Sequence, residues 1–268
     1  MGKAEEKVLA AVAEALRQQP AGLLTDLDGT ISRIAAWPGA ATVSPVCRAC
    51  LAELCRRLRL VAVVSGRPAA AARDLVGVPG AVYVGNHGFE LWQRGRATVL
   101  PAARPFVPLV EAALRELEYG LGILPGVSYE NKGVTASVHY RLAADPEAAR
   151  QAILGSLRRS PAAGQLRCTE GRMVVELRPP LAVDKDTAVS ELLRERELRA
   201  AVYLGDDTTD VDAFRALHLW ARETGGRALA VAVLSSEAPP AVVEEADLTL
   251  PGVGAVERLL SGLVETPW

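Results

Sequence analysis

The chain has 268 residues, half of them hydrophobic, and its 30 Lys and Arg against 32 Asp and Glu give a net charge of -2. This length is sufficient for one large α/β domain or for a core with a smaller second domain. Because the basic excess of nucleic-acid-binding proteins is missing, we expect no nucleic-acid partner. The apolar runs are far shorter than the roughly 20 residues of a membrane span, so we expect no membrane association and a cytoplasmic location.

Helical and strand patterns alternate along most of the chain. Val8, Val12 and Leu16 recur at helical spacing, so residues 1–19 predict an amphipathic helix. Further along, short apolar runs alternate with helical patterns, which predicts a Rossmann-like core built on a doubly wound parallel sheet. The expected strands of that sheet are residues 23–26, 60–64, 82–84, 201–204 and 229–233.

The middle third of the chain has a different pattern. Three segments there alternate polar and apolar side chains, which is typical of antiparallel strands with one solvated face. They are residues 127–129, 135–140 and 173–177. Prolines precede and follow this region and indicate hinges. We therefore predict an α/β fold in which residues 1–104 and 181–268 form the core and residues 105–180 form an inserted, smaller α/β cap domain.

Two clusters of carboxylates follow two of the expected strands. Asp26 and Asp28 come directly after the first strand. Asp206, Asp207 and Asp210 come directly after the strand at residues 201–204. Because the carboxyl ends of parallel strands share one edge of a sheet, we expect both clusters to face one pocket. Carboxylates about 4 Å apart repel by roughly 4 kcal/mol at an effective dielectric near 20, and an all-oxygen ligand set of this kind suits Mg²⁺.

Lysine is scarce in this chain. Only four of the 30 basic residues are Lys, at positions 3, 7, 132 and 185. Lys carries a compact ammonium whereas Arg carries a planar fork, so an isolated Lys in an Arg-rich chain points to a chemical role. We interpret Lys132 and Lys185 in this way, and likewise the only two Asn, Asn86 and Asn131.

Four motifs follow one another along the chain, namely the Asp-x-Asp-Gly-Thr sequence at residues 26–30, Ser-Gly-Arg at 65–67, Lys185, and Gly-Asp-Asp at 205–207. In these motifs and their order the chain resembles the haloacid dehalogenase superfamily of phosphotransferases. The resemblance implies that Asp26 attacks phosphorus to form an aspartyl phosphate. It also implies that Asp28 protonates the leaving oxygen and then activates water.

The same resemblance implies a magnesium ion as cofactor. Its ligands would be the Asp26 carboxylate, the Asp28 backbone carbonyl and Asp206, while Asp207 and Asp210 would tune its water molecules. For the phosphoryl group, the resemblance implies a hydrogen bond from Ser65 and charge neutralisation by Lys185. Thr30 and Gly66 are assigned to the same substrate site.

Further sequences resemble trehalose-6-phosphate phosphatases, namely residues 85–90, 130–133 with 139–141, and 205–210 with 212–214. By this resemblance Glu130, Lys132 and Glu176 of the cap would bind sugar hydroxyls, and Arg67, Asn86, His87 and Arg178 would lie around the substrate. The implied reaction is hydrolysis of trehalose 6-phosphate to trehalose and phosphate, with a trehalose-6-phosphate synthase as a functional partner.

Three alternatives remain open at the level of sequence. A related phosphatase acting on sucrose phosphate or a glycosyl-phosphoglycerate would differ in its cap. A phospho-acceptor signalling domain would need no residue like Asp28. A sugar-phosphate-binding module without catalysis would be expected to lose Asp26 or Asp28. One departure from the family matters here, because Asp186 follows Lys185 where Gly is usual, and its carboxylate would either cap a helix or weaken phosphate binding.

Overall fold

The computed structural model describes residues 2–35, 37–171, 173–235 and 238–266. The chain divides into two compact units. The core unit consists of Met1–Thr98 and Val183–Trp268, and the inserted unit is Val99–Ala182. The inserted unit thus begins before the predicted boundary at 105 and ends after the predicted one at 180. The reason is that the 3₁₀ helix Pro101–Phe106 runs directly into the helix α4 (Val107–Leu121) and packs against it, so no hinge separates them.

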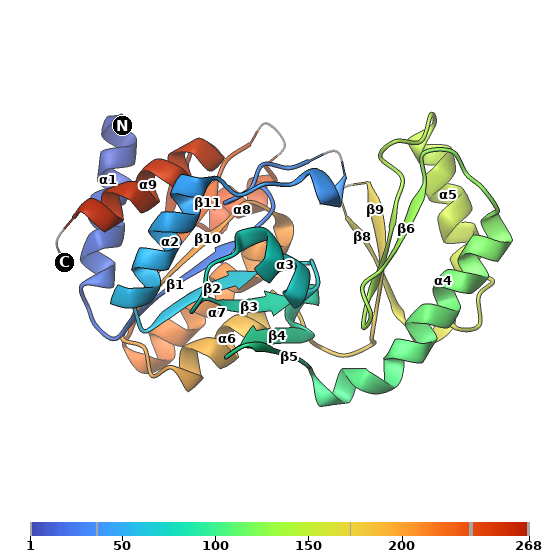
Figure 1. The fold of residues 1–268 in the computed structure, drawn as a ribbon, viewed down its shortest axis with the longest axis horizontal. Coiled ribbons are helices and arrows are strands. Elements are labelled where there is room, and N and C mark those ends of the chain that lie inside the picture. Colours follow the sequence, from blue (N-terminus) through green and yellow to red (C-terminus); the bar gives the residue numbers. More distant parts are fainter. Residues whose placement is uncertain (1, 36, 172, 236–237, 267–268) are drawn as a thin grey trace. The chain divides into compact units, whose positions relative to one another are not determined.

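The core unit is built on one eight-stranded sheet with the strand order β12-β11-β10-β1-β2-β3-β4-β5 (Figure 1). All neighbours from β12 to β3 are parallel, and β4 is antiparallel to β3. The predicted α/β fold with a mainly parallel sheet is therefore confirmed. The strands are β1 (Ala21–Asp26), β2 (Leu60–Val64), β3 (Val82–Gly85), β4 (Glu90–Gln93), β5 (Arg96–Val99), β10 (Ala200–Gly205), β11 (Arg227–Val233) and β12 (Leu248–Leu250).

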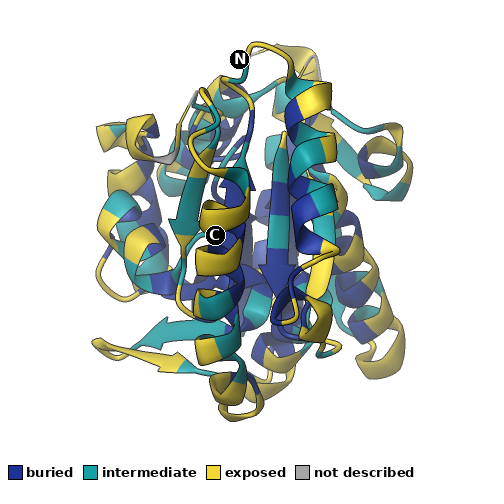
Figure 2. Cartoon of the chain, turned by 90° about the vertical axis from the view of Figure 1, so that its right-hand side faces the viewer, coloured by how far each residue is buried: buried dark blue, intermediate teal, exposed yellow. Residues whose placement is uncertain are grey.

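Helices cover both faces of this sheet, because neighbouring residues of a strand point to opposite faces. In β1, Leu23 packs into one apolar cluster with α1, α2, α3 and α9, and Leu24 packs into a second cluster with α6, α7 and α8. Figure 2 shows the buried residues gathered on the strands and on the inner sides of the helices. These helices are α1 (Lys3–Leu16), α2 (Pro45–Arg57), α3 (Ala69–Val76), α6 (Lys185–Glu195), α7 (Thr208–Thr224), α8 (Pro240–Glu245) and α9 (Val253–Glu265), joined by 3₁₀ turns at Pro38–Ala40 and Asn86–Gly88.

The inserted unit holds a four-stranded antiparallel sheet with the order β6-β7-β9-β8. Alternation along these strands turns Val138 and Leu177 toward α4 and α5, where they join an apolar cluster, and turns Ser137 and Glu176 to the other face. The remaining elements are α5 (Pro146–Leu157), a 3₁₀ turn at Ala163–Gln165, β6 (Ser128–Asn131), β7 (Ala136–His139), β8 (Arg167–Gly171) and β9 (Val174–Arg178).

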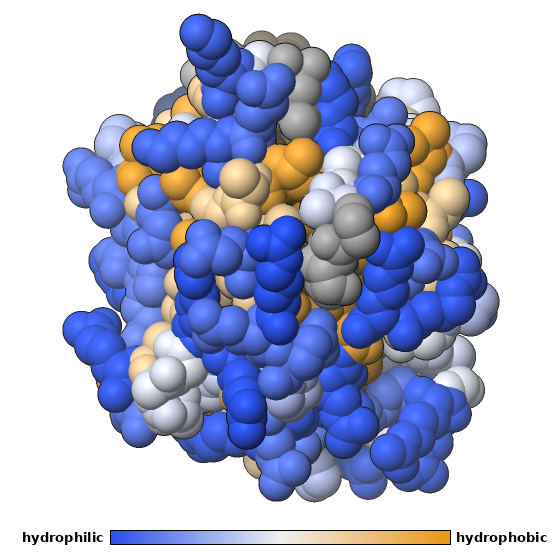
Figure 3. Space-filling view, turned by 90° about the vertical axis from the view of Figure 1, so that its left-hand side faces the viewer, coloured by the Kyte–Doolittle hydropathy of each residue, from blue (hydrophilic) through white to orange (hydrophobic). Residues whose placement is uncertain are grey.

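The surface of the core unit around α1 and α9 is mainly hydrophilic, with apolar side chains confined to small areas (Figure 3). Helix α1 follows the predicted amphipathic pattern, because Val8, Val12 and Leu16 are buried while most of the intervening residues are exposed or half-buried. Within the described residues, no helix combines the length and the apolar character that crossing a membrane requires.

Candidate active site

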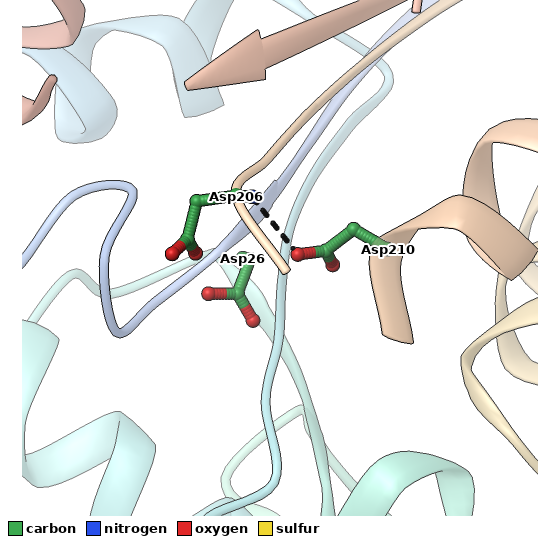
Figure 4. A group of neighbouring side chains, drawn as sticks. All are labelled: Asp26, Asp206 and Asp210. Carbon is green, nitrogen blue, oxygen red and sulfur yellow. Dashed lines mark hydrogen bonds between the residues drawn. The ribbon is translucent and has the colours of Figure 1, made fainter. Parts of the chain in front are cut away.

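Both predicted acidic clusters lie at the same edge of the core sheet. Asp26 ends β1, and Asp206 follows the neighbouring strand β10 directly. The carboxylates of Asp26, Asp206 and Asp210 are buried, and one oxygen of each lies within 4.8 Å of the others. Figure 4 shows the three side chains converging. The parallel arrangement of β1 and β10 is therefore what brings together groups that are separated by some 180 residues of sequence.

Lys185 contacts two of these carboxylates. It is the first residue of α6, and its Nζ atom donates to Asp26 Oδ1 at 2.6 Å and to Asp210 Oδ1 at 2.7 Å. Burial by itself would lower the pKa of Lys185, but the two carboxylates raise it above the ordinary lysine value. The ammonium therefore stays charged and fixes the positions of both acids.

One ammonium does not balance three buried carboxylates. Burial raises the pKa of Asp26 well above its ordinary value; Lys185 opposes this rise, whereas Asp210 and Asp206 add to it. A further positive charge at this position would favour the ionised form of Asp26. The donor set consists of carboxylate oxygens, which are the ligands that hard divalent cations prefer. The described residues of the cluster thus fit a divalent cation.

Asp210 holds the loop that follows β10. Its Oδ2 atom accepts hydrogen bonds from the backbone N–H groups of Asp206 and Asp207, each at 3.0 Å (the contact to Asp206 is dashed in Figure 4). Its Oδ1 atom accepts from Lys185 and also from the hydroxyl of Tyr203, at 2.9 Å. Asp207 is the N-cap of α7, and its carboxylate accepts from the backbone at the helix start. The two acids therefore set the position of Asp206.

The chain after β1 approaches Asp206 very closely. Gly29 has a φ of +99°, and a Cβ atom added there would lie 2.1 Å from Asp206 Oδ2. The hydroxyl of Thr30 donates to Asp206 Oδ1 at 3.3 Å, and Thr30 is completely buried. The structure thus places Thr30, which we predicted as a substrate contact, against Asp206.

Asp28 and Arg67 form an ion pair that uses both carboxylate oxygens. Arg67 Nε donates to Asp28 Oδ2 at 2.7 Å, and Nη2 donates to Oδ1 at 2.8 Å. The preceding Ser65 is buried, and its Oγ atom accepts from the backbone N–H of Arg67 at 3.2 Å. This pair links the loop after β1 to the loop after the adjacent strand β2.

Asn86 and His87 form a left-handed turn beside the same loop. Their φ angles are 49° and 57°, and both residues are buried. The Asn86 N–H donates to the Arg67 carbonyl at 2.8 Å, and a Cβ atom added at Gly66 would lie 2.5 Å from His87 Nε2. The structure therefore brings the predicted residues 65–67 and 86–87 together.

A second polar cluster lies in the inserted unit, on the sheet face opposite α4 and α5. Lys132 Nζ lies 3.6 Å from Glu176 Oε1 and 3.9 Å from Glu130 Oε2, although only 8% of the Lys132 side chain is exposed. Arg178 Nε donates to Glu176 Oε2 at 3.0 Å. All four residues predicted for the cap thus lie in one cluster of alternating charge.

The sequence profile of the trehalose-phosphatase family matches residues 24–240. The chain belongs to this family. It is 38% identical over 235 residues to a trehalose-phosphate phosphatase of Mycobacterium marinum, which is 82% of this chain and 58% of that protein. The corresponding enzyme of Mycobacterium tuberculosis is 38% identical over 203 residues, or 74% of this chain and 51% of that protein. The chain therefore spans a little over half the length of these curated relatives.

Solved structures show the same fold. The C-terminal domain of C. albicans trehalose-6-phosphate phosphatase has a TM-score of 0.78 at 22% identity, covering 97% of this chain and 96% of that one. A haloacid dehalogenase-like hydrolase from Bacteroides thetaiotaomicron has a TM-score of 0.61 at 15% identity, covering 90% of this chain and 98% of that one. The predicted α/β fold of the chain is thus shared with these solved structures.

Asp186 is where this chain departs from the trehalose-phosphatase family pattern noted above. Its Oδ1 atom accepts a hydrogen bond from the backbone N–H of Thr187 at 2.6 Å. Asp184 is the N-cap of α6, and its own backbone N–H donates to Thr187 Oγ1 at 3.1 Å. Of the two expectations for Asp186, capping of the helix is the one with a supporting contact.

Three contacts escaped the sequence-based prediction. Tyr203 contacts Asp210 in the core unit, and a hydroxyl within an otherwise apolar buried strand was the available signal. In the inserted unit, His139 Nε2 lies 3.0 Å from Glu130 Oε2, and the Ser137 hydroxyl donates to Glu176 Oε1 at 3.4 Å. For these two residues, the signal was their alternation with buried apolar residues along β7.

Proposed function

We propose that this chain is a magnesium-dependent phosphatase that hydrolyses trehalose 6-phosphate to trehalose and phosphate. The observation that carries the proposal is the buried contact of Lys185 with both Asp26 and Asp210 beside Asp206. A buried group of charges that costs stability is most readily explained by a chemical role. The names of the curated relatives support the substrate.

In the proposed reaction Asp26 is the nucleophile. One of its carboxylate oxygens attacks phosphorus while the bond from phosphorus to the sugar oxygen breaks, and Asp28 gives a proton to that oxygen as trehalose leaves. Water then attacks phosphorus of the aspartyl phosphate, Asp28 takes a proton from this water, and Asp26 is regenerated as phosphate leaves. Lys185 holds the Asp26 carboxylate in place and offsets negative charge as the phosphoryl group is transferred.

The metal ligands in this proposal are the Asp26 carboxylate, the Asp28 backbone carbonyl and the Asp206 carboxylate. When bound, Mg²⁺ would neutralise charge on the phosphoryl oxygens. The chain supports the Asp206 carboxylate through the Thr30 hydroxyl and through the loop that Asp210 holds. Ser65 and the backbone at Gly66 are the proposed contacts of the phosphoryl group.

The polar cluster of the inserted unit is the proposed sugar site. Glu130, Lys132 and Glu176 offer both hydrogen-bond donors and acceptors within a few ångströms of one another. Arg178 contacts Glu176 and adds further donors. A site built to hydrogen-bond many hydroxyls strongly rejects analogues that lack them, so this cluster would select a disaccharide. Asn86 and His87 are proposed as further substrate contacts.

We place this activity in the cytoplasm, where a trehalose-6-phosphate synthase would supply the substrate. The synthase is thus the proposed functional partner, and direct contact between the two proteins is not required. The resemblance in fold to the C-terminal domain of a Candida albicans trehalose synthase regulatory protein, with a TM-score of 0.70 at 14% identity, concerns the fold alone.

The test is phosphate release with and without Mg²⁺ from trehalose 6-phosphate, sucrose 6-phosphate, glucose 6-phosphate and an aryl phosphate. We expect preference for trehalose 6-phosphate, dependence on Mg²⁺, and loss of activity in Asp26→Asn. Equal rates on all four substrates would contradict the assigned sugar. Phosphate release that survives in Asp26→Asn would contradict the nucleophile, and binding of trehalose 6-phosphate without any release would indicate a non-catalytic binding module.

A further inference from the structure

The bidentate pair of Asp28 and Arg67 fixes the plane of the Asp28 carboxylate. Each of its oxygens accepts one guanidinium N–H, at 2.7 and 2.8 Å. Two parallel charge-assisted hydrogen bonds define the orientation of a carboxylate far more closely than a single contact does. Both side chains are largely shielded from water, with 18% of Arg67 and 33% of Asp28 exposed.

The backbone of Arg67 is itself held at both ends. Its N–H donates to Ser65 Oγ at 3.2 Å, and its carbonyl accepts from the N–H of Asn86 at 2.8 Å. The turn at Asn86 and His87 therefore supports the loop that carries Arg67. The guanidinium reaches Asp28 from the end of β2, which pairs with β1 over its length. Asp28 itself lies in the loop after β1, directly before Gly29 with its φ of +99°.

We propose that Arg67 is a positioning residue that orients Asp28 for proton transfer. This inference rests on the proposed function, because it takes Asp28 to be the group that protonates the leaving oxygen. It goes beyond the expectation that Arg67 contacts substrate. A general acid acts only within hydrogen-bond reach of the atom that it protonates, and misplacement by about 1 Å lowers rates by about 100-fold.

Two substrates with different leaving groups distinguish orientation of Asp28 by Arg67 from binding of the phosphoryl group by Arg67. A sugar alkoxide is strongly basic and needs a proton as it leaves. A phenolate is a much weaker base, because a phenol has a pKa near 10, and it leaves readily without a proton. A sugar phosphate and an aryl phosphate carry the same phosphoryl group. A residue that orients the acid therefore matters for the sugar phosphate, and a residue that binds phosphate matters for both.

The experiment measures release of trehalose from trehalose 6-phosphate and of nitrophenol from nitrophenyl phosphate in single turnovers with enzyme in excess. Single turnovers isolate the first transfer step from the later use of Asp28 as a base. We expect Arg67→Ala to slow trehalose release by about 100-fold or more and nitrophenol release by less than about tenfold. Arg67→Lys keeps the positive charge but loses the two parallel hydrogen bonds of the guanidinium, so we expect trehalose release to remain slow in this variant.

A double-mutant cycle adds an independent criterion. If Arg67 acts through Asp28, the variant that combines Arg67→Ala with Asp28→Asn should release trehalose no more slowly than Asp28→Asn alone. Arg115→Ala, at an exposed position of α4, serves as the control for expression and handling, and thermal unfolding checks that each variant is folded.

Equal slowing of both substrates, an effect that disappears at saturating enzyme concentration, or additive effects in the cycle would overturn the inference while leaving the proposed function standing. A wild-type protein that releases phosphate from neither substrate would overturn the proposed function, and this inference with it.

Discussion

The hydroxyl of Tyr203 donates a hydrogen bond to Asp210 Oδ1 at 2.9 Å, and both residues are completely buried within the core unit. The same oxygen accepts from Lys185, so a neutral donor and a charged donor share one carboxylate oxygen. Burial raises the pKa of Tyr203 well above its ordinary value, and the hydroxyl therefore remains a donor at every physiological pH. Asp210 is thus held from two elements, β10 and α6.

Tyr203→Phe removes this hydroxyl and keeps the ring, whose edge-to-face contact with Phe214 has a centroid distance of 5.7 Å. A hydrogen bond to a charged group contributes about 1.5–3 kcal/mol, so we expect the free energy of unfolding to fall by about that amount. Urea unfolding measures it. Tyr119→Phe, at a side chain exposed to solvent, is the matched control and should leave stability unchanged. Equal stability of both variants would contradict the prediction.

Lys185→Met removes the ammonium that contacts the buried carboxylates of Asp26 and Asp210. Breaking a buried ion pair costs about 3–5 kcal/mol, because it leaves a buried charge unbalanced. We expect a loss of that size in the free energy of unfolding, measured in guanidinium chloride with EDTA. Adding Asp26→Asn to this variant should recover part of the loss, since one of the unbalanced carboxylates is then neutral. No recovery in the double variant would show that the Lys185 contacts are not the source of the effect.

Gly29→Ala tests the close approach of the first loop to Asp206. The added Cβ atom would lie 2.1 Å from Asp206 Oδ2, so the carboxylate must move. We expect Mg²⁺ affinity, measured by calorimetric titration, to fall at least about tenfold, because metal ligands need defined positions. Gly77→Ala is the control, since Gly77 also has a positive φ of +67° but no atom within 4 Å of the added Cβ. It should lower stability by about 1 kcal/mol through backbone strain and leave Mg²⁺ affinity intact.

Lys132→Met tests the polar cluster of the inserted unit. Lys132 lies between the carboxylates of Glu176 and Glu130, so its loss removes a donor and one positive charge from beside both acids. We expect KM for trehalose 6-phosphate to rise at least about tenfold, while kcat/KM for an aryl phosphate changes little, because the aryl substrate has no sugar hydroxyls to bind. Steady-state kinetics on both substrates decide this. A parallel loss on the two substrates would assign Lys132 to the phosphoryl group or to folding.

Cys47 should resist alkylation in the folded protein. Burial, with smaller contributions from Cys50 and Glu257, raises the pKa of the Cys47 thiol to about 12. Only the thiolate reacts, so its rate with iodoacetamide should increase about tenfold per pH unit from pH 8 to 10, from a value far below that of the unfolded chain. Mass spectrometry of native and urea-treated samples measures each cysteine separately. Equal rates for Cys47 in the two samples would contradict its burial.

The sequence by itself determined the core of this protein. The predicted strands are parallel and largely buried on both faces, so they appear in the sequence as short apolar runs without alternating polar residues. They are β1, β2, β3, β10 and β11. Since strands of this kind end at a common edge, the sequence was enough to predict that Asp26 and Asp206 meet, and the family resemblance added Lys185 to them. The trehalose-phosphatase relationship followed from further sequences, at residues 85–90, 130–133 with 139–141, and 205–210 with 212–214.

Other elements left no comparable pattern. β12 has three residues, and β5 is largely exposed, so neither forms an apolar run. The inserted unit begins at Val99, before the expected position 105, because Pro105, taken as a hinge, lies within a 3₁₀ helix that continues into α4. A proline is compatible with a helix start as well as with a linker, and only packing distinguishes the two.

Only the tertiary structure decided which side chains face each other within the site. The sequence places Thr30 and Arg67 within two of the motifs, but it does not show that Arg67 forms an ion pair with Asp28 or that Thr30 contacts Asp206. Nor does it pair Tyr203 with Asp210. These contacts depend on the direction of side chains from adjacent strands and loops, and strand pairing, which is a long-range property, sets that direction.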